Sequence, residues 1–214
     1  MFDPLFNFLI EGGVPKDTII VLLMFPIIAS FIVAARQIVG IKAFGIYAPL
    51  IITFTFLEVN IKYGFAIFIM ALLVASLTRF VLKKFSILYL PKMALILSIT
   101  VMTMFFILIE AILNNRTILV NLPIYQILII ITLVEKFINV QIEKGYRTAI
   151  VLSVETLILS SLGYYIISND WIRELVFNNP LIVILFFIII ILLGKYDGLR
   201  INEYIRFRKL ISNR

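Results

Sequence analysis

The chain has 214 residues, of which 63% are hydrophobic and 14% are charged, and its mean hydropathy is +1.13. A soluble domain is roughly half apolar and about a quarter charged, so this composition indicates a polytopic membrane protein. The absence of Cys and His excludes disulfides, thiol chemistry, and the commonest metal ligand and general base. We attribute the net charge of +7 to loops that face anionic lipid headgroups, not to nucleic-acid binding.

Seven apolar segments follow one another along the chain. A bilayer core takes about 20 apolar residues, with roughly 17 as the lower limit, so most of these segments can cross as helices. We therefore predict an all-α integral membrane protein built as a seven-transmembrane-helix bundle. The predicted spans are 18–35, 43–57, 63–78, 93–109, 117–134, 148–168 and 175–194, the second being the shortest.

The ends of the chain differ in character. We expect residues 1–16 to form a short extracytoplasmic or interfacial segment, because residues 1–10 are too few to span and Gly12, Gly13 and Pro15 separate them from the first helix. No signal peptide is expected, since acidic Asp3 and Glu11 precede the first apolar run and no cleavage pattern follows it. Residues 17–195 form the membrane domain, and no internal repeat divides it. Residues 196–214 form a basic cytoplasmic tail.

Basic residues alternate between the segments that separate the spans. The odd-numbered segments hold only Lys16, Lys62, Arg116 and Arg173, while the even-numbered segments hold the other fifteen of the 19 Lys and Arg residues. Basic residues that flank membrane spans stay on the cytoplasmic side. The N-terminus is therefore predicted to lie outside and the C-terminus in the cytoplasm.

The junction of spans one and two breaks the ordinary pattern of a membrane helix. Gly45 and Pro49 lie inside a span that is already short, where Pro removes an intrahelical hydrogen bond and Gly adds backbone freedom. Transporters use short, interrupted spans to expose backbone groups to a substrate. The alternative is a kink that only improves packing, since Gly and Pro are frequent in membrane helices.

Glu155 is the one acidic residue in the middle of a predicted span. A carboxylate at such depth costs on the order of 3 kcal/mol against lipid, so it should face protein. Arg36, Lys42 and Arg79 are its candidate partners, in a structural ion pair or in a substrate or proton site. Small residues form a stripe elsewhere on this helix, so we expect Glu155 to contact the bundle on a separate face; the stripe comprises Ala149, Ser153, Thr156, Ser160 and Gly163.

The cytoplasmic tail has two interpretations. Its mixture of basic and apolar residues suits a helix that lies on an anionic membrane surface. It also suits a docking element for a cytoplasmic enzyme. The candidate docking residues are Arg147, Arg200, Glu203, Tyr204, Arg206 and Arg208.

Three stretches carry a resemblance to a known family: residues 36–49, residues 143–147, and residues 194–208. They resemble the bacterial seven-transmembrane domain that is usually fused to an inactive transglutaminase-like domain, and the likeness extends over nearly the whole chain. In that family the fused domain precedes the spans on the extracytoplasmic side. Here only residues 1–12 stand in its place, which implies a separate extracytoplasmic domain protein as a partner. The resemblance also implies a cytoplasmic ATP-grasp ligase as a partner and the bacterial cytoplasmic membrane as the location.

We therefore expect a membrane subunit of a peptide or polyamino-acid ligation and export system. The rival interpretation is a small-molecule or ion transporter that uses Glu155 as its coupling carboxylate. A membrane enzyme is a weaker third, because His and Cys are absent and no catalytic residue is established for the family. No cofactor and no nucleic acid are expected, and the lipid bilayer is an expected partner.

The predicted topology can be tested by cysteine labelling in this Cys-free chain. Cysteines placed at Asn115 and Asn169 should react with a membrane-impermeant reagent added outside intact cells, because their segments carry few basic residues. Cysteines at Ser86 and Asn202 should react only after the cells are lysed. The opposite labelling pattern would invert the topology.

Overall fold

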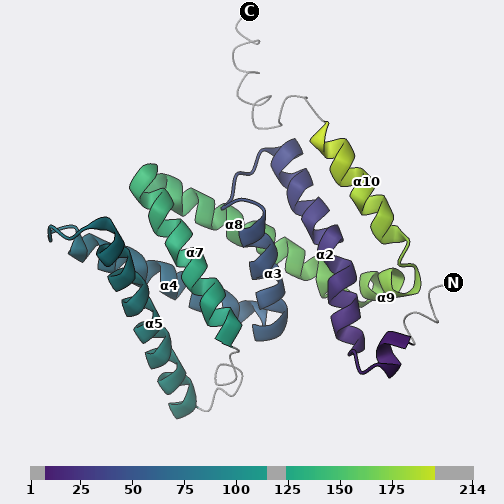
Figure 1. Cartoon of the computed structure of the whole chain (residues 1–214), viewed down its shortest axis with the longest axis horizontal. Helices are drawn as coiled ribbons and strands as arrows, with labels where there is room; N and C mark the ends of the chain where they lie inside the picture. Colours follow the sequence, from purple (N-terminus) through teal and green to yellow (C-terminus); the bar gives the residue numbers. More distant parts are fainter. Residues whose placement is uncertain (1–7, 115–123, 196–214) are drawn as a thin grey trace, which may run out of the picture. The chain divides into compact units, whose positions relative to one another are not determined.

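The computed structural model describes residues 8–114 and 124–195 (Figure 1). Within these ranges the chain forms helices and connecting turns and no strand, which confirms the all-helical prediction. Hydrocarbon offers the backbone no hydrogen-bond partner, so an apolar segment satisfies its N–H and C=O groups by coiling into a helix. The chain divides into two compact units, Met1–Lys42 with Leu162–Arg214, and Ala43–Ser161, and each is described by itself.

The first unit is organised around α2 (Lys16–Ala34), the long helix near its N-terminus. It also contains the π-helical turn η1 (Ala35–Val39), α9 (Asp170–Asn178) and α10 (Ile182–Gly194). Both α9 and α10 pack against α2. An ion pair of 2.7 Å between Arg173 Nη2 and Asp17 Oδ1 joins α9 to the start of α2.

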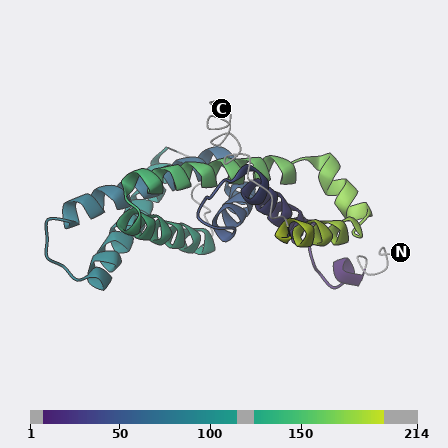
Figure 2. The ribbon, with the colours of Figure 1, turned by 90° about the horizontal axis from the view of Figure 1, so that it is seen from above.

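The seventh predicted span is broken, contrary to the prediction of one continuous run over 175–194. Helix α9 ends at Asn178, α10 begins at Ile182, and the two axes differ in direction by 102°, a turn visible in Figures 1 and 2. Pro180 lies in this break. Proline has no N–H and disfavours helical backbone at the residue before it, so the helix ends there.

The second unit contains α3 (Tyr47–Val59), α4 (Ile61–Leu82), α5 (Tyr89–Leu113), α7 (Ile124–Glu143) and the first part of α8 (Tyr146–Ile167). Helix α4 packs against α3, α5 and α7, and α7 also packs against α3 and α5. Large apolar side chains fill the interior of this unit, among them Phe56, Phe68, Ile96, Val134 and Ile138.

Each of the seven predicted segments contains helix, but the helices differ in length. In the described part, five are long and apolar enough to cross a membrane, namely α2 with η1, α4, α5, α7 and α8. The bent pair of α9 and α10 makes up to six. Helix α3 has 13 residues, which corresponds to roughly 20 Å, so it is shorter than a bilayer core of about 30 Å.

Helix α7 continues well past the predicted end at residue 134. Its buried face runs on through Phe137, Ile138 and Gln141, whereas Glu135 and Glu143 are exposed. The charged residues that we took as the end of the span lie on the outer face of an amphipathic helix. The uncharged apolar segment therefore ends at residue 134, whereas the helix that contains it continues to Glu143.

A close contact fixes the α3–α4 hairpin. A Cβ atom added to Gly64 of α4 would lie 2.6 Å from Cδ1 of Phe56, and this ring is 1% exposed. Glycine here lets the two helices approach until the ring covers the backbone. The interior around the ring is filled, so the ring has little room to move away.

Replacing Gly64 with Ala should therefore lower the melting temperature of the purified protein in detergent. Overpacking of this kind costs about 1–3 kcal/mol. Gly194→Ala is the matched control, since a Cβ there meets nothing within 4 Å. A second change, Phe56→Leu, should recover part of the loss in the Gly64→Ala background; equal melting temperatures for Gly64→Ala and Gly194→Ala would contradict the proposed contact.

Candidate functional site

A non-helical turn over residues 43–46 directly precedes α3. Ala43 and Gly45 have φ angles of 45° and 85°, in the left-handed region that favours glycine. The sequence predicts both Gly45 and Pro49 inside the second span; the structure has Pro49 inside the helix but Gly45 before it. Gly45 precedes the helix, and Pro49 lies in its first turn, where backbone N–H groups have no intrahelical acceptor. Pro49 therefore does not interrupt α3.

Two consecutive side chains of α8 hold two consecutive amides of this turn. Glu155 Oε2 accepts a hydrogen bond from the Ala43 N–H at 2.8 Å, and Thr156 Oγ1 accepts one from the Phe44 N–H at 3.0 Å. Ala43 and Phe44 are 6% and 7% exposed, so neither amide has water as an alternative partner. A buried N–H without an acceptor costs about 1–3 kcal/mol, which makes these contacts necessary for the turn.

Hydroxyl groups extend the contact from the turn to α3 itself. Ser160 Oγ lies 3.0 Å from the Pro49 carbonyl and 2.8 Å from the Thr156 carbonyl of its own helix. Thr53 Oγ1 likewise lies 3.2 Å from the Ser160 carbonyl and 2.8 Å from the Pro49 carbonyl, so each hydroxyl shares its one proton between the two helices. Both hydroxyl-bearing residues are fully buried. Small residues on both helices allow this approach, and the hydrogen bonds define its register.

The small stripe on α8 and Glu155 serve the same segment, not separate faces as we expected. Thr156 belongs to the stripe, and Glu155 precedes it by one residue, yet they bind neighbouring amides. Glutamate is long enough to reach around the helix, whereas the short threonine side chain contacts only what lies directly above it. Helical spacing gives only the direction in which each side chain leaves the helix axis. It does not account for how far the longer glutamate side chain reaches.

The candidate partners of Glu155 are distributed over different places. Arg79 lies on α4, and its side chain makes no hydrogen bond or ion pair within residues 8–114 and 124–195, so the expected pair with Glu155 is not formed. Arg36 lies in η1 and is partly exposed, and Lys42 is exposed; both belong to the first unit. Within the second unit the carboxylate binds backbone, at the Ala43 amide.

Of the candidate docking residues, the structure describes one. Arg147 is the second residue of α8 and is exposed. Arg200, Glu203, Tyr204, Arg206 and Arg208 lie outside the described residues. Within the described ranges no group of three or more acidic residues could hold a metal ion.

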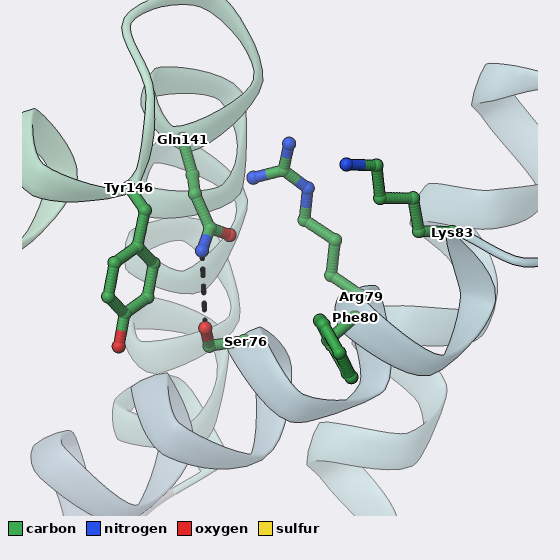
Figure 3. A pocket seen from close by; sticks show the side chains of 6 residues that line it. All are labelled: Ser76, Arg79, Phe80, Lys83, Gln141 and Tyr146. Atoms are coloured by element: carbon green, nitrogen blue, oxygen red, sulfur yellow. Dashed lines mark hydrogen bonds between the residues drawn. The ribbon is translucent and has the colours of Figure 1, made fainter.

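Sequence reasoning missed a second polar site in the same unit. A cavity of about 320 Å³ opens beside the C-terminal ends of α4 and α7 and the first residue of α8 (Figure 3). Its lining residues are Ser76, Arg79, Phe80, Lys83, Gln141 and Tyr146. The residue that could have indicated this site is Gln141, a polar residue whose helical spacing puts it on the buried face of α7. Because the predicted span ends at residue 134, Gln141 was assigned to a loop and its position on that face was not recognised.

The hydrogen bonds to the turn can be tested through Thr156. Thr156→Val keeps the shape of the side chain but removes the acceptor for the Phe44 amide, so hydrogen exchange over residues 43–46 should accelerate. Stability should fall by about 1–3 kcal/mol. Thr156→Ser keeps the hydroxyl and is the matched control. Unchanged exchange in Thr156→Val, measured by mass spectrometry, would show that the turn does not depend on this bond.

Comparison with known proteins agrees with this architecture. A family model described as seven transmembrane helices usually fused to an inactive transglutaminase matches residues 12–211. No curated protein and no solved structure matches the chain. The seven predicted membrane segments and the all-helical structure accord with the match, which covers nearly the whole sequence. The chain belongs to the family of seven-transmembrane-helix domains that are usually fused to an inactive transglutaminase.

Proposed function

We propose that this multi-pass membrane protein is a subunit of a peptide or polyamino-acid ligation and export system and that it recruits a cytoplasmic ligase of the ATP-grasp type. The family is described by its usual fusion to an inactive transglutaminase, which is consistent with a role other than catalysis. A membrane subunit of this kind needs a surface on which a soluble enzyme can dock.

The observation that carries the proposal is a basic surface at one end of the second unit. Tyr89 Oη donates to Asn139 Oδ1 at 2.7 Å, and Gln141 Nε2 donates to Ser76 Oγ at 3.2 Å. These bonds bring the start of α5 and the ends of α4 and α7 together, and α8 begins beside them. The surface, which we call the basic end, comprises Lys84, Lys92, Lys144 and Arg147.

The residues of the basic end are exposed or partly exposed, and the charge pattern of the sequence predicts a cytoplasmic position for them. Among acidic residues, Glu143 lies nearby and is also exposed. A positive surface accelerates the encounter with a partner whose surface is acidic and disfavours partners of like charge. We propose that the tail residues Arg200, Glu203, Tyr204, Arg206 and Arg208 extend the same docking surface.

The transporter alternative rests on a different observation. A non-helical turn beside an intramembrane carboxylate is an arrangement that transporters use for binding. Glu155→Gln separates the two functions, since glutamine keeps an oxygen that accepts from Ala43 but cannot carry charge. A docking subunit that carries Glu155→Gln retains its cellular activity, whereas a carboxylate-coupled transporter with the same substitution loses transport.

Docking can be tested by reversing charges at the basic end. The full chain is tagged, purified from membranes of its native host, and assayed for ATP hydrolysis that depends on added amino acid or peptide. Lys84→Glu combined with Lys144→Glu and Arg147→Glu should reduce the retained activity by roughly tenfold or more, because like charges now oppose the partner.

Lys62→Glu, near the start of α4 at its other end, is the control for a change of charge alone and should retain the activity. Expression and helix content must match the unchanged protein in both variants. If no amino-acid-dependent ATP hydrolysis accompanies the unchanged chain, the ligase proposal is wrong.

A further inference from the structure

The cavity beside α4 and α7 is built from cationic, polar and aromatic side chains and has no acidic residue in its lining. Arg79 lies in the last turn of α4, Lys83 caps the end of this helix one turn later, and both line the cavity. Figure 3 shows their head groups reaching to the same side of the pocket. Like charges four residues apart on a helix destabilise each other, so an anion between them would offset their repulsion.

Neither cation has a protein partner in the part of the chain that the structure describes. Their side chains make no hydrogen bond and no ion pair there. Arg79 is only partly exposed, so water does not fully replace a partner. Arginine presents a planar fork of donors that matches phosphate oxygens, and lysine adds a point charge. The pair is therefore suited to a phosphate group.

Gln141 adds a second, independent observation. This residue is 7% exposed, its Nε2 donates to Ser76 Oγ, and its Oε1 is buried without a hydrogen-bond partner. The Ser76 hydroxyl thus satisfies the nitrogen of the Gln141 side-chain amide but leaves its oxygen without a donor. A buried carbonyl oxygen needs a donor. Figure 3 shows this oxygen on the side of the cavity that faces Arg79.

We propose that this cavity binds a phosphate ester that carries a hydroxyl group. The phosphate binds Arg79 and Lys83, and the hydroxyl donates to Gln141 Oε1. The volume of about 320 Å³ is at the lower end of the range of roughly 300–1,000 Å³ for small-molecule sites, which suits a headgroup-sized ligand. Phe80 and Tyr146 supply exposed aromatic walls of the kind found at membrane interfaces. This inference does not depend on the proposed function.

The shared chemistry has two sources, a phospholipid headgroup or a soluble phosphate ester. Short-chain phosphatidylglycerol and glycerol phosphate carry the same phosphoglycerol group, with and without acyl chains. Short-chain phosphatidylcholine has a phosphate but no hydroxyl donor. Each probe is titrated into the full, delipidated chain in non-ionic detergent, and bound ligand is counted by native mass spectrometry.

We expect saturable binding of phosphatidylglycerol or glycerol phosphate, and weaker binding of phosphatidylcholine. Binding of phosphatidylglycerol alone identifies a lipid headgroup, and equal binding of glycerol phosphate identifies a soluble ligand. Arg79→Gln or Lys83→Gln should weaken binding by roughly tenfold or more, because each removes a charge-assisted contact. Lys62→Gln, which removes a charge near the other end of α4 and outside the lining, is the matched control and should bind as the unchanged chain does.

Gln141→Glu keeps the size of the side chain and places a carboxylate beside the two cations, so it should abolish binding while the helix content stays unchanged. This variant keeps the test decisive if an Arg79 or Lys83 variant fails to fold. The proposal is overturned if the unchanged chain binds neither phosphoglycerol probe. It is also overturned if Gln141→Glu and Lys62→Gln bind these probes equally well.

Discussion

Inside a bilayer, a backbone N–H group that leaves a helix must find its acceptor in the protein, and the second unit depends on how this constraint is met at residues 43–46. The turn has two buried amides in sequence, and α8 supplies one carboxylate and one hydroxyl for them. Ala43 also adopts a left-handed conformation that costs a non-glycine residue about 1–2 kcal/mol. The bonds from Glu155 and Thr156 offset that cost and position α3 against α8.

The bond between Glu155 and the Ala43 amide gives this intramembrane carboxylate a structural role. Glu155 would ordinarily indicate a proton or substrate site. Here its bond to Ala43 places it among the groups that hold the fold together, together with the hydroxyls of Thr53, Thr156 and Ser160. A second set of polar groups lies elsewhere in the unit, where α4 and α7 end. Arg79 lies in the last turn of α4 and Lys83 is its C-cap, and cations there interact favourably with the negative end of the helix dipole.

The sequence predicted the helices well where a long apolar run has no alternative to coiling. It predicted the boundaries poorly where a helix is amphipathic or interrupted. Glu135 and Lys136 looked like the end of a span, but α7 carries them on its outer face and continues to Glu143. Pro49 looked like a break, but it lies in the first turn of α3. For α7 the decisive information is which face of the helix meets a neighbour, and for Pro49 it is where the helix begins.

Composition and periodicity by themselves determined that the chain is an all-helical membrane protein with seven apolar segments. The reason is that hydrocarbon offers backbone N–H and C=O groups no hydrogen-bond partner, so such segments satisfy these groups by forming helices. The depth of Glu155 likewise determined that its carboxylate needs a partner in the protein. Only the tertiary structure decided that a backbone amide 112 positions away is one such partner, and that Arg79 and Gln141 line one cavity. These contacts depend on the rotation of each helix about its axis and on the reach of individual side chains, and spacing within one segment specifies neither.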